Sequence, residues 1–249
     1  MPKYDFRMPR LHVDAPLAGG GVVSLDHDQA NYLVNVLRLP RGGDLLLFNG
    51  RDGEWRARLA GTKKAPIAEV GEQARAQPPA GDLHFLFAPL KHARLDYLVQ
   101  KAVEMGASRI EPVLTRFTQV SRVNVERMRA NVIEAAQQCG VLNVPEVAGP
   151  VDFAVMVAGL DARRLLVFCD EDAEVKDPVV ALGAARGGGA KLAVLIGPEG
   201  GFAEEERAAL LKRPQVVRLA LGPRILRADT AAVAALALVQ AVLGDWRGA

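Results

Sequence analysis

The sequence predicts an α/β protein with two domains: a small β-rich domain, then a parallel sheet with helices on both faces. Three observations predict it. Up to residue 77, short alternating apolar runs are separated by turn signals, a pattern typical of strands. From residue 83, apolar strands alternate with amphipathic helices, which indicates a parallel sheet. Between them, residues 77–82 contain two prolines and a glycine and form the best linker in the chain.

The first domain, residues 1–77, is expected to be a small barrel. Val22–Leu25 is a short strand candidate, and Ala30–Leu37 has apolar residues at helical spacing. Leu45–Phe48 is a further strand, followed by a hairpin-turn signal at Asn49–Gly53. Glu54–Leu59 alternates polar and apolar residues, as a half-buried strand does.

The second domain, residues 83–249, is expected to place its ligand beyond the carboxyl ends of its strands, as open parallel sheets do. Glycines after two of its helices, Gly106 and Gly140, mark helix ends. The predicted strands are Leu83–Ala88, Arg109–Leu114, Leu165–Cys169, Leu192–Ile196 and Val216–Leu221, and the predicted helices are Ala93–Met105, Val123–Cys139, Asp177–Ala185, Ala203–Leu211 and Thr230–Leu243.

Composition excludes several classes. The 249 residues carry a net charge of +2, with no strongly basic tail, so any surface that binds nucleic acid would be a local patch. Two cysteines fit a reduced compartment without a disulfide framework, and the four histidines lack metal-ligand spacing, so no metal site is expected. There is no signal-peptide pattern and no apolar run long enough for a membrane span, so a cytoplasmic protein is expected.

A glycine-rich loop, Gly197–Phe202, follows the apolar strand Leu192–Ile196. Glycines allow a ligand to approach the backbone, although a tight turn alone would also explain them. The spacing fits neither common phosphate-loop motif. Three glutamates, residues 204–206, open the next helix and would repel a phosphate at its amino end. A cationic ligand without phosphate, such as S-adenosylmethionine, fits the loop better.

A second loop, Leu221–Arg227, contains two apolar residues, Ile225 and Leu226, between two arginines. A helix start capped by Asp229 or Thr230 would explain its backbone but not its apolar residues. An apolar wall for an adenine ring, beside arginines that face RNA, would explain them.

These two loops resemble the RsmE family of 16S rRNA uridine N3-methyltransferases, which belongs to the SPOUT class. The resembling runs are Leu195–Phe202 and Leu221–Arg227, and similarity extends over nearly the whole chain. Residues 36–39, 43–44 and 48–50 resemble the family's PUA-like barrel. Further matches are Lys91, Gln100-Lys101, Glu104, Gly106, residues 138–140 and residues 144–146.

The resemblance implies a SPOUT fold with a C-terminal trefoil knot, a homodimer, and S-adenosylmethionine bound bent within the knot. It implies an RNA substrate in the small ribosomal subunit, 16S rRNA. The residues expected to bind the cofactor are Leu195, Ile196, Gly197, Pro198, Glu199, Gly200, Gly201, Leu219, Leu221, Gly222, Ile225, Leu226, Arg227 and Thr230.

The chain departs from the family pattern at several positions. Asp229 replaces a usual Glu, Val141 a usual Arg, and Gln137 a usual Glu. Thr115-Arg116-Phe117 replaces a usual Thr-Glu-Arg. The cofactor loops are intact, so these departures bear on the nucleotide that is methylated more than on the methyl donor.

For catalysis, Arg227 is the candidate to stabilise a uracil anion, because its loop should meet the cofactor's methyl group. Asp229 is a weaker candidate to accept the N3 proton, and Glu199 is another carboxylate that could reach it or hold the loop. Cys139 and Cys169 are expected to be core thiols. The arginines and lysine expected to contact RNA are Arg7, Arg10, Arg38, Arg41, Lys91 and Arg224.

Two other interpretations remain open from the sequence. A knotted methyltransferase could modify another RNA base or a ribose hydroxyl. A non-catalytic RNA-binding assembly factor could have kept the fold and lost activity. A nucleotide-phosphate enzyme is disfavoured by the glutamates at 204–206.

Overall fold

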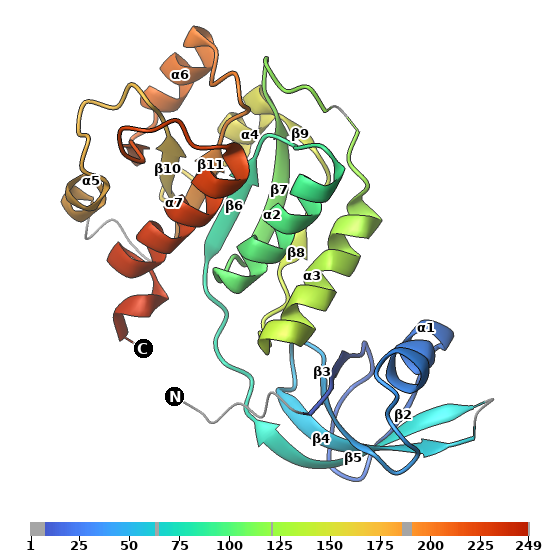
Figure 1. Cartoon of the computed structure of the whole chain (residues 1–249). Coiled ribbons are helices and arrows are strands. Elements are labelled where there is room, and N and C mark those ends of the chain that lie inside the picture. Colours follow the sequence, from blue (N-terminus) through green and yellow to red (C-terminus); the bar gives the residue numbers. More distant parts are fainter. Residues whose placement is uncertain (1–7, 63–64, 121, 186–190, 249) are drawn as a thin grey trace. The chain divides into compact units, whose positions relative to one another are not determined.

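The structure is a computed structural model, and it describes residues 8–62, 65–120, 122–185 and 191–248. Contacts between Cα atoms divide the chain into two compact units (Figure 1). The first contains residues up to Ala80 together with Ile133–Val144, and the second contains Gly81–Val132 and Pro145–Ala249. The sequence-based boundary treated the second domain as continuous. It did not anticipate that the end of one helix and the following turn would group with the first unit.

A curled five-stranded sheet with the order β1-β3-β4-β5-β2 forms the first unit. All its pairs are antiparallel except β1 with β3. Its core is built from leucines, valines and alanines, including Leu33, Leu45 and Leu47, each fully buried. The elements are β1 (Arg10–His12), β2 (Val22–Ser24), α1 (His27–Asn31), the π-helix η1 (Tyr32–Val36), β3 (Asp44–Phe48), β4 (Glu54–Gly61) and β5 (Pro66–Arg75).

The helix predicted at Ala30–Leu37 is wrong in its start and its type. Asp26 caps α1 by accepting a hydrogen bond from the Gln29 backbone N–H, and the Gln29 side chain accepts one from the Asp26 backbone. This capping box starts the helix at His27. The last turn widens to a π-helix, in which the Leu37 N–H bonds to the Tyr32 carbonyl.

A parallel sheet with the order β12-β10-β11-β6-β7-β8 forms the second unit, with β9 paired to β7. The order departs from the chain order because β11 returns to lie between β6 and β10. The strands are β6 (Leu83–Phe87), β7 (Arg109–Leu114), β8 (Glu146–Val147), β9 (Val151–Asp152), β10 (Leu165–Cys169), β11 (Leu192–Ile196) and β12 (Val216–Leu219).

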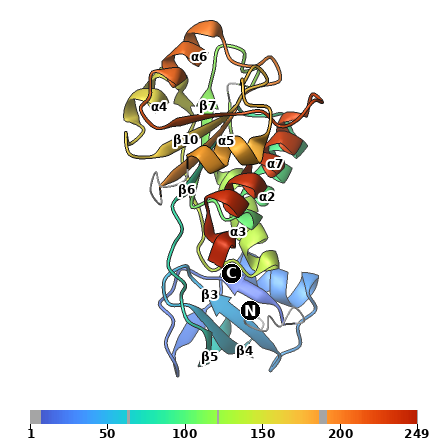
Figure 2. The same cartoon turned by 90° about the vertical axis from the view of Figure 1, so that its left-hand side faces the viewer.

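Helices cover both faces of this sheet. In Figure 1, α2 and α7 lie side by side in front of the sheet and α4 lies behind it, and α6 shares a hydrophobic cluster with α4. Figure 2 shows α5 beside α7, an adjacency that their contacts confirm. The helices are α2 (His92–Glu104), α3 (Val125–Cys139), α4 (Phe153–Gly159), α5 (Pro178–Ala184), α6 (Glu204–Leu211), α7 (Ala228–Val242) and the short η2 (Asp245–Gly248).

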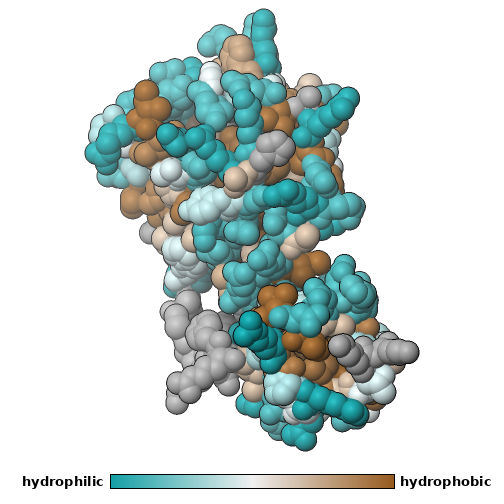
Figure 3. Space-filling view, turned by 45° about the vertical axis from the view of Figure 1, so that its right-hand side comes forward, coloured by the Kyte–Doolittle hydropathy of each residue, from teal (hydrophilic) through white to brown (hydrophobic). Residues whose placement is uncertain are grey.

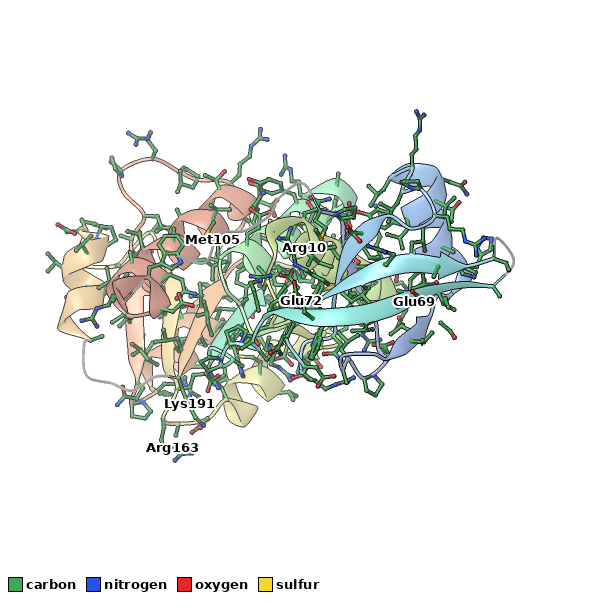
Figure 4. All side chains as sticks on the ribbon, turned by 90° about the horizontal axis from the view of Figure 1, so that it is seen from below. Arg10, Glu69, Glu72, Met105, Arg163 and Lys191 are labelled. Atoms are coloured by element: carbon green, nitrogen blue, oxygen red, sulfur yellow. The ribbon has the colours of Figure 1, made fainter. Side chains whose placement is uncertain are left out.

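The amino-terminal edge of this sheet is held by an ionic cluster. The Asp161 carboxylate binds Lys191 at 3.0 Å and Arg163 at 3.4 Å, and Figure 4 shows the two cations together. These contacts, with the Arg163 backbone N–H as the largest cause, hold the pKa of Asp161 well below its usual range. Lys191 precedes β11 and Arg163 precedes β10, so this cluster lies at the edge of the sheet opposite the loops that follow the two strands.

Candidate cofactor and RNA site

Two loops that the sequence singled out meet at one edge of the sheet. β10 pairs in parallel with β11 on one side and with β12 on the other. The loops that leave β11 and β12 therefore emerge at the same carboxyl edge, where α6 and α7 begin (Figure 1). We call residues 197–203 the glycine loop and residues 220–227 the arginine loop.

The glycine loop is anchored at both ends. Leu195 and Ile196 are buried in β11, so only their backbone is available to a ligand. The Gly201 N–H bonds to the Pro198 carbonyl at 2.9 Å, and Gly201 has a φ of +72°, which favours glycine. Phe202 is buried, with its ring centroid 5.9 Å from that of Phe168. The exposed residues of the turn are Glu199 and Gly200.

Glu206 fastens this loop to a neighbouring turn. Its carboxylate accepts a hydrogen bond from the Ala203 N–H at 2.9 Å and one from the Arg116 N–H at 2.8 Å. The acidic first turn of α6 was expected from the sequence, and Glu204–Glu206 do form it. The structure adds that one of the three carboxylates caps the helix and binds the turn after β7.

The arginine loop has fewer internal contacts. Within the described residues, 221–226 form no hydrogen bond. Leu219 is fully buried at the end of β12, Leu221 and Leu226 are half-buried, and Ile225 is fully exposed. An apolar side chain open to solvent, at the same sheet edge as the glycine loop, is suited to an apolar ligand face.

Arg224 and Arg227 of the arginine loop are exposed, and neither forms an ion pair with a described carboxylate. Arg227 is the residue that precedes α7, so the prediction that Asp229 or Thr230 caps this helix is wrong. Asp229 instead lies in the first helical turn, where its carboxylate accepts from the Thr230 N–H at 2.9 Å. A carboxylate there stabilises the helix through its dipole.

Sequence reasoning missed a third loop at this edge, which follows β10. Asp170 is buried, and its carboxylate is held by Arg207 at 3.2 Å and Arg218 at 2.9 Å. Its neighbour Glu171 is exposed and lies 3.3 Å from the position that a Cβ on Gly201 would take. A buried carboxylate with two arginine partners is costly to break, so it fixes this turn beside the glycine loop. The sequence signal that could have revealed this loop is the acidic run of residues 170–172, directly after the apolar strand β10.

The expected RNA-contacting residues divide into three groups. Arg38, Arg41, Lys91 and Arg224 are exposed and unpaired within the described residues. Arg10 is buried, with its Nε 2.9 Å from the Glu54 carboxylate, so the prediction that it contacts RNA is wrong. Arg7 lies outside the described residues.

Arg38 stands out in the first group because it has a φ of +54°, a rare conformation for a residue with a side chain. It follows a run of exposed apolar residues, Val34, Val36 and Leu37. Hydrophobic surface on the first unit is visible in Figure 3. Backbone strain beside exposed apolar residues is common at binding sites.

The two cysteines behave differently. Burial, and then the Asp170 carboxylate, raise the pKa of the Cys169 thiol to about 12, so the protonated thiol is favoured there at neutral pH. Cys139 is exposed, so the prediction that it is a core thiol is wrong.

Among the described residues, no cluster suited to a metal ion occurs. None of the described helices is long and apolar enough to cross a membrane.

The departures from the family pattern fall in different units. Gln137 and Val141 lie in the segment that groups with the first unit. The Gln137 side-chain oxygen accepts a hydrogen bond from the His12 N–H at 2.9 Å, so it has a structural role there. Asp229 and the turn at 115–118 belong to the second unit.

Comparison with known proteins identifies two family models. An RNA methyltransferase domain matches residues 76–240, and an RNA methyltransferase PUA domain matches residues 25–71. The ribosomal RNA small subunit methyltransferase E of Synechocystis is 32% identical over 89% of this chain and 73% of its own length. The protein of the same name from Rickettsia conorii is 28% identical, over 93% and 94%.

Solved structures agree. A ribosomal RNA small subunit methyltransferase E from Neisseria gonorrhoeae, bound to S-adenosylmethionine, has a TM-score of 0.86, 27% identity, and coverage of 96% of this chain and 99% of its own. A Legionella pneumophila methyltransferase in complex with the same cofactor has a TM-score of 0.77 and 27% identity, with coverage of 94% and 98%. The chain therefore belongs to the RNA methyltransferase family that includes the ribosomal RNA small subunit methyltransferases E.

Proposed function

We propose that this protein transfers a methyl group from S-adenosylmethionine to N3 of a uridine in the RNA of the small ribosomal subunit. The observation that carries the proposal is the meeting of the glycine loop and the arginine loop at one sheet edge, on either side of the β10 turn. Both loops keep the sequence that resembles the uridine N3-methyltransferases, and the family match extends to the first unit.

The residues at this edge fit S-adenosylmethionine. Gly197, Gly200 and Gly201 leave backbone groups open to a ligand, and Ile225 offers an apolar surface to an adenine ring. The carboxylates of Glu199 and Glu171 are exposed beside the loop and would attract a cation. The same charges disfavour a ligand phosphate.

The cofactor supplies an electrophilic methyl group on its sulfonium. The protein's task is to place the uracil N3 in line with that group and to remove the N3 proton, whose pKa in solution is roughly 9 to 10. Arg227 is exposed and unpaired at the start of α7, so its guanidinium is available to stabilise the uracil anion. We assign the proton acceptor role to Asp229, two residues away, with Glu199 as the alternative.

On the RNA side, we assign phosphate contacts to Arg38 and Arg41 in the first unit and to Lys91 and Arg224 in the second. All four are exposed and have no carboxylate partner among the described residues. Removing one such cation should weaken RNA binding. It should also reduce, by about one, the slope of the logarithm of the affinity against the logarithm of the salt concentration. Neutralising Arg38 and Arg41 together tests this by titrating small subunits at several salt concentrations.

We further propose a trefoil knot, a homodimer and a cytoplasmic reaction. The return of β11 between β6 and β10 supports a crossed C-terminal path, and the family resemblance supports both the knot and the dimer. The apolar last helix is weaker support for the dimer than its sequence suggested, because half of its twelve apolar residues are buried within the chain and only Ala241 among them is exposed. Light scattering of the purified protein measures the oligomeric state.

The test uses labelled S-adenosylmethionine and small subunits from cells that lack the corresponding enzyme, followed by digestion and identification of the labelled nucleoside. Labelled 3-methyluridine supports the proposal. A different labelled base or a labelled ribose overturns the uridine assignment. Absence of label, with cofactor binding shown by calorimetry, contradicts catalysis and favours a non-catalytic assembly factor.

A further inference from the structure

A rigid turn follows β7 at the carboxyl edge of the sheet. The Thr115 N–H donates to the Thr118 hydroxyl at 2.9 Å, the two threonine hydroxyls lie 2.9 Å apart, and the Thr118 N–H donates to the Thr115 carbonyl at 3.1 Å. Thr115 is buried, and the Arg116 N–H binds Glu206. The backbone of Arg116 and Phe117 is therefore held from both sides.

Phe117 is presented to solvent by this turn. Its exposed fraction is 46%, whereas the six other phenylalanines of the described residues are all buried. An exposed phenylalanine does not contribute the stability that burial of its ring would give, and here its backbone is also held in place. This combination points to a binding role.

The ring lies against the glycine loop. A Cβ built on Gly200 would lie 3.4 Å from the Phe117 Cβ and 3.7 Å from its Cγ, so the side chain leaves its backbone directly beside the loop. Gly200 is itself exposed. Phe117 thus borders the proposed cofactor site on the side away from the arginine loop, since β7 and β12 lie on opposite sides of β11 in the sheet.

Two arginines lie near this turn and the glycine loop. The Arg116 side chain is 65% exposed and its guanidinium is 3.8 Å from the Glu205 carboxylate. Arg94, in the first turn of α2, is 3.7 Å from Glu199. Exposed pairs at these distances contribute little to stability, so neither arginine is held tightly by its carboxylate. An aromatic face with adjacent weakly paired arginines is the combination that binds unstacked RNA bases and their backbone.

We propose that Phe117 is a stacking platform for a nucleobase of the substrate RNA, either the target base or its neighbour, and that Arg116 contacts the adjoining phosphate. The inference rests on the proposed function and specifies how that site binds RNA. A base must leave its stack to reach a methyl donor in a protein pocket, and an aromatic ring replaces the missing stacking partner.

The test compares Phe117→Ala, Phe117→Trp and Phe117→Leu in the full-length protein. The substrate is small subunits from cells lacking the modification, and S-adenosylmethionine affinity is measured by calorimetry. Phe117→Ala should raise the KM for subunits about tenfold, because the base has no ring to stack on. Phe117→Trp should restore the wild-type KM, and Phe117→Leu should behave as Phe117→Ala. Trp246→Ala is the control, since Trp246 is similarly exposed, at 47%, beyond the other end of α7.

Three results would overturn the inference. The first is an unchanged KM for subunits in Phe117→Ala, and the second is a wild-type KM in Phe117→Leu. The third is a loss of S-adenosylmethionine affinity in Phe117→Ala as large as its rise in KM, which would mean that Phe117 only supports the glycine loop. Direct binding of subunits by filter retention keeps the test independent of methylation. If the wild-type protein binds subunits but labels no uridine, the proposed function fails while the Phe117 comparison is still decided by binding.

Discussion

The glycine loop and the arginine loop leave parallel strands at one sheet edge, yet they are built differently. Phe202 in the core and the Glu206 carboxylate anchor the glycine loop, while residues 221–226 of the arginine loop form no hydrogen bond among the described residues. If both loops bind the cofactor, as we propose, the glycine loop is expected to be preformed for it. The arginine loop is expected to order further on binding, at an entropic cost that reduces affinity.

The largest expected effect comes from the arginine loop. Arg227→Ala removes the cation assigned to the uracil anion, so kcat should fall about 100-fold or more. Stability should stay near wild type, since Arg227 is exposed and unpaired within the described residues. Cofactor affinity should also stay near wild type, because the contact expected between Arg227 and the cofactor is through the backbone. Single-turnover methylation of unmodified small subunits measures the effect. Near-normal turnover in this variant would refute the role of Arg227.

A smaller effect is expected from loosening the glycine loop. Glu206→Ala leaves the Ala203 and Arg116 N–H groups without their acceptor, which should lower the free energy of unfolding by about 1 kcal/mol and weaken cofactor binding about tenfold. Calorimetry and urea unfolding measure both. Glu204→Ala is the matched control, because Glu204 is exposed in the same helical turn. Equal effects of the two variants would show that charge, and not the tether, matters.

Ile225→Ala tests the apolar surface of the arginine loop. Because Ile225 is fully exposed, the free energy of unfolding should not change, while cofactor affinity should fall about fivefold, or about 1 kcal/mol. Leu211→Ala, an exposed leucine at the end of α6, is the control. If cofactor affinity is unchanged, the adenine ring does not contact Ile225.

The smallest effect concerns the opposite edge of the sheet. Burial, and then Arg164, lower the pKa of His84 in β6 below its usual 6.5. The unfolded chain then binds more protons between pH 6.5 and the folded pKa, so stability should fall as pH drops through that window. In urea unfolding, the difference in stability between wild type and His84→Gln should be constant above that window and shift against wild type within it. Parallel curves at every pH would contradict this.

The sequence predicted the strands that are apolar throughout. It missed the strands that form only because a neighbouring strand pairs with them. β10 and β11 are apolar throughout and have the predicted bounds. In β5 (Pro66–Arg75) only Ala68 and Val70 are buried and half of the residues are exposed, so the segment is a strand because it pairs with β4 and β2. β8 and β9 have two residues each, too few for any periodicity.

The site divides in the same way. Gly197–Phe202 and Leu221–Arg227 are local motifs, so the sequence could reveal them. The tether between Glu206 and Arg116 joins residues 90 positions apart, and only the fold brings them together. The prediction that Arg10 contacts RNA was wrong because Arg10 is buried by its ion pair with Glu54, a residue of another strand that the local sequence around Arg10 does not reveal.

Hydrogen–deuterium exchange with and without S-adenosylmethionine tests the central claim most directly, namely that these two loops form the cofactor site. The account predicts strong new protection across residues 220–227 and a smaller change across residues 197–203, which are already held in the free protein. Protection confined to other segments, with cofactor binding confirmed by calorimetry, would contradict it.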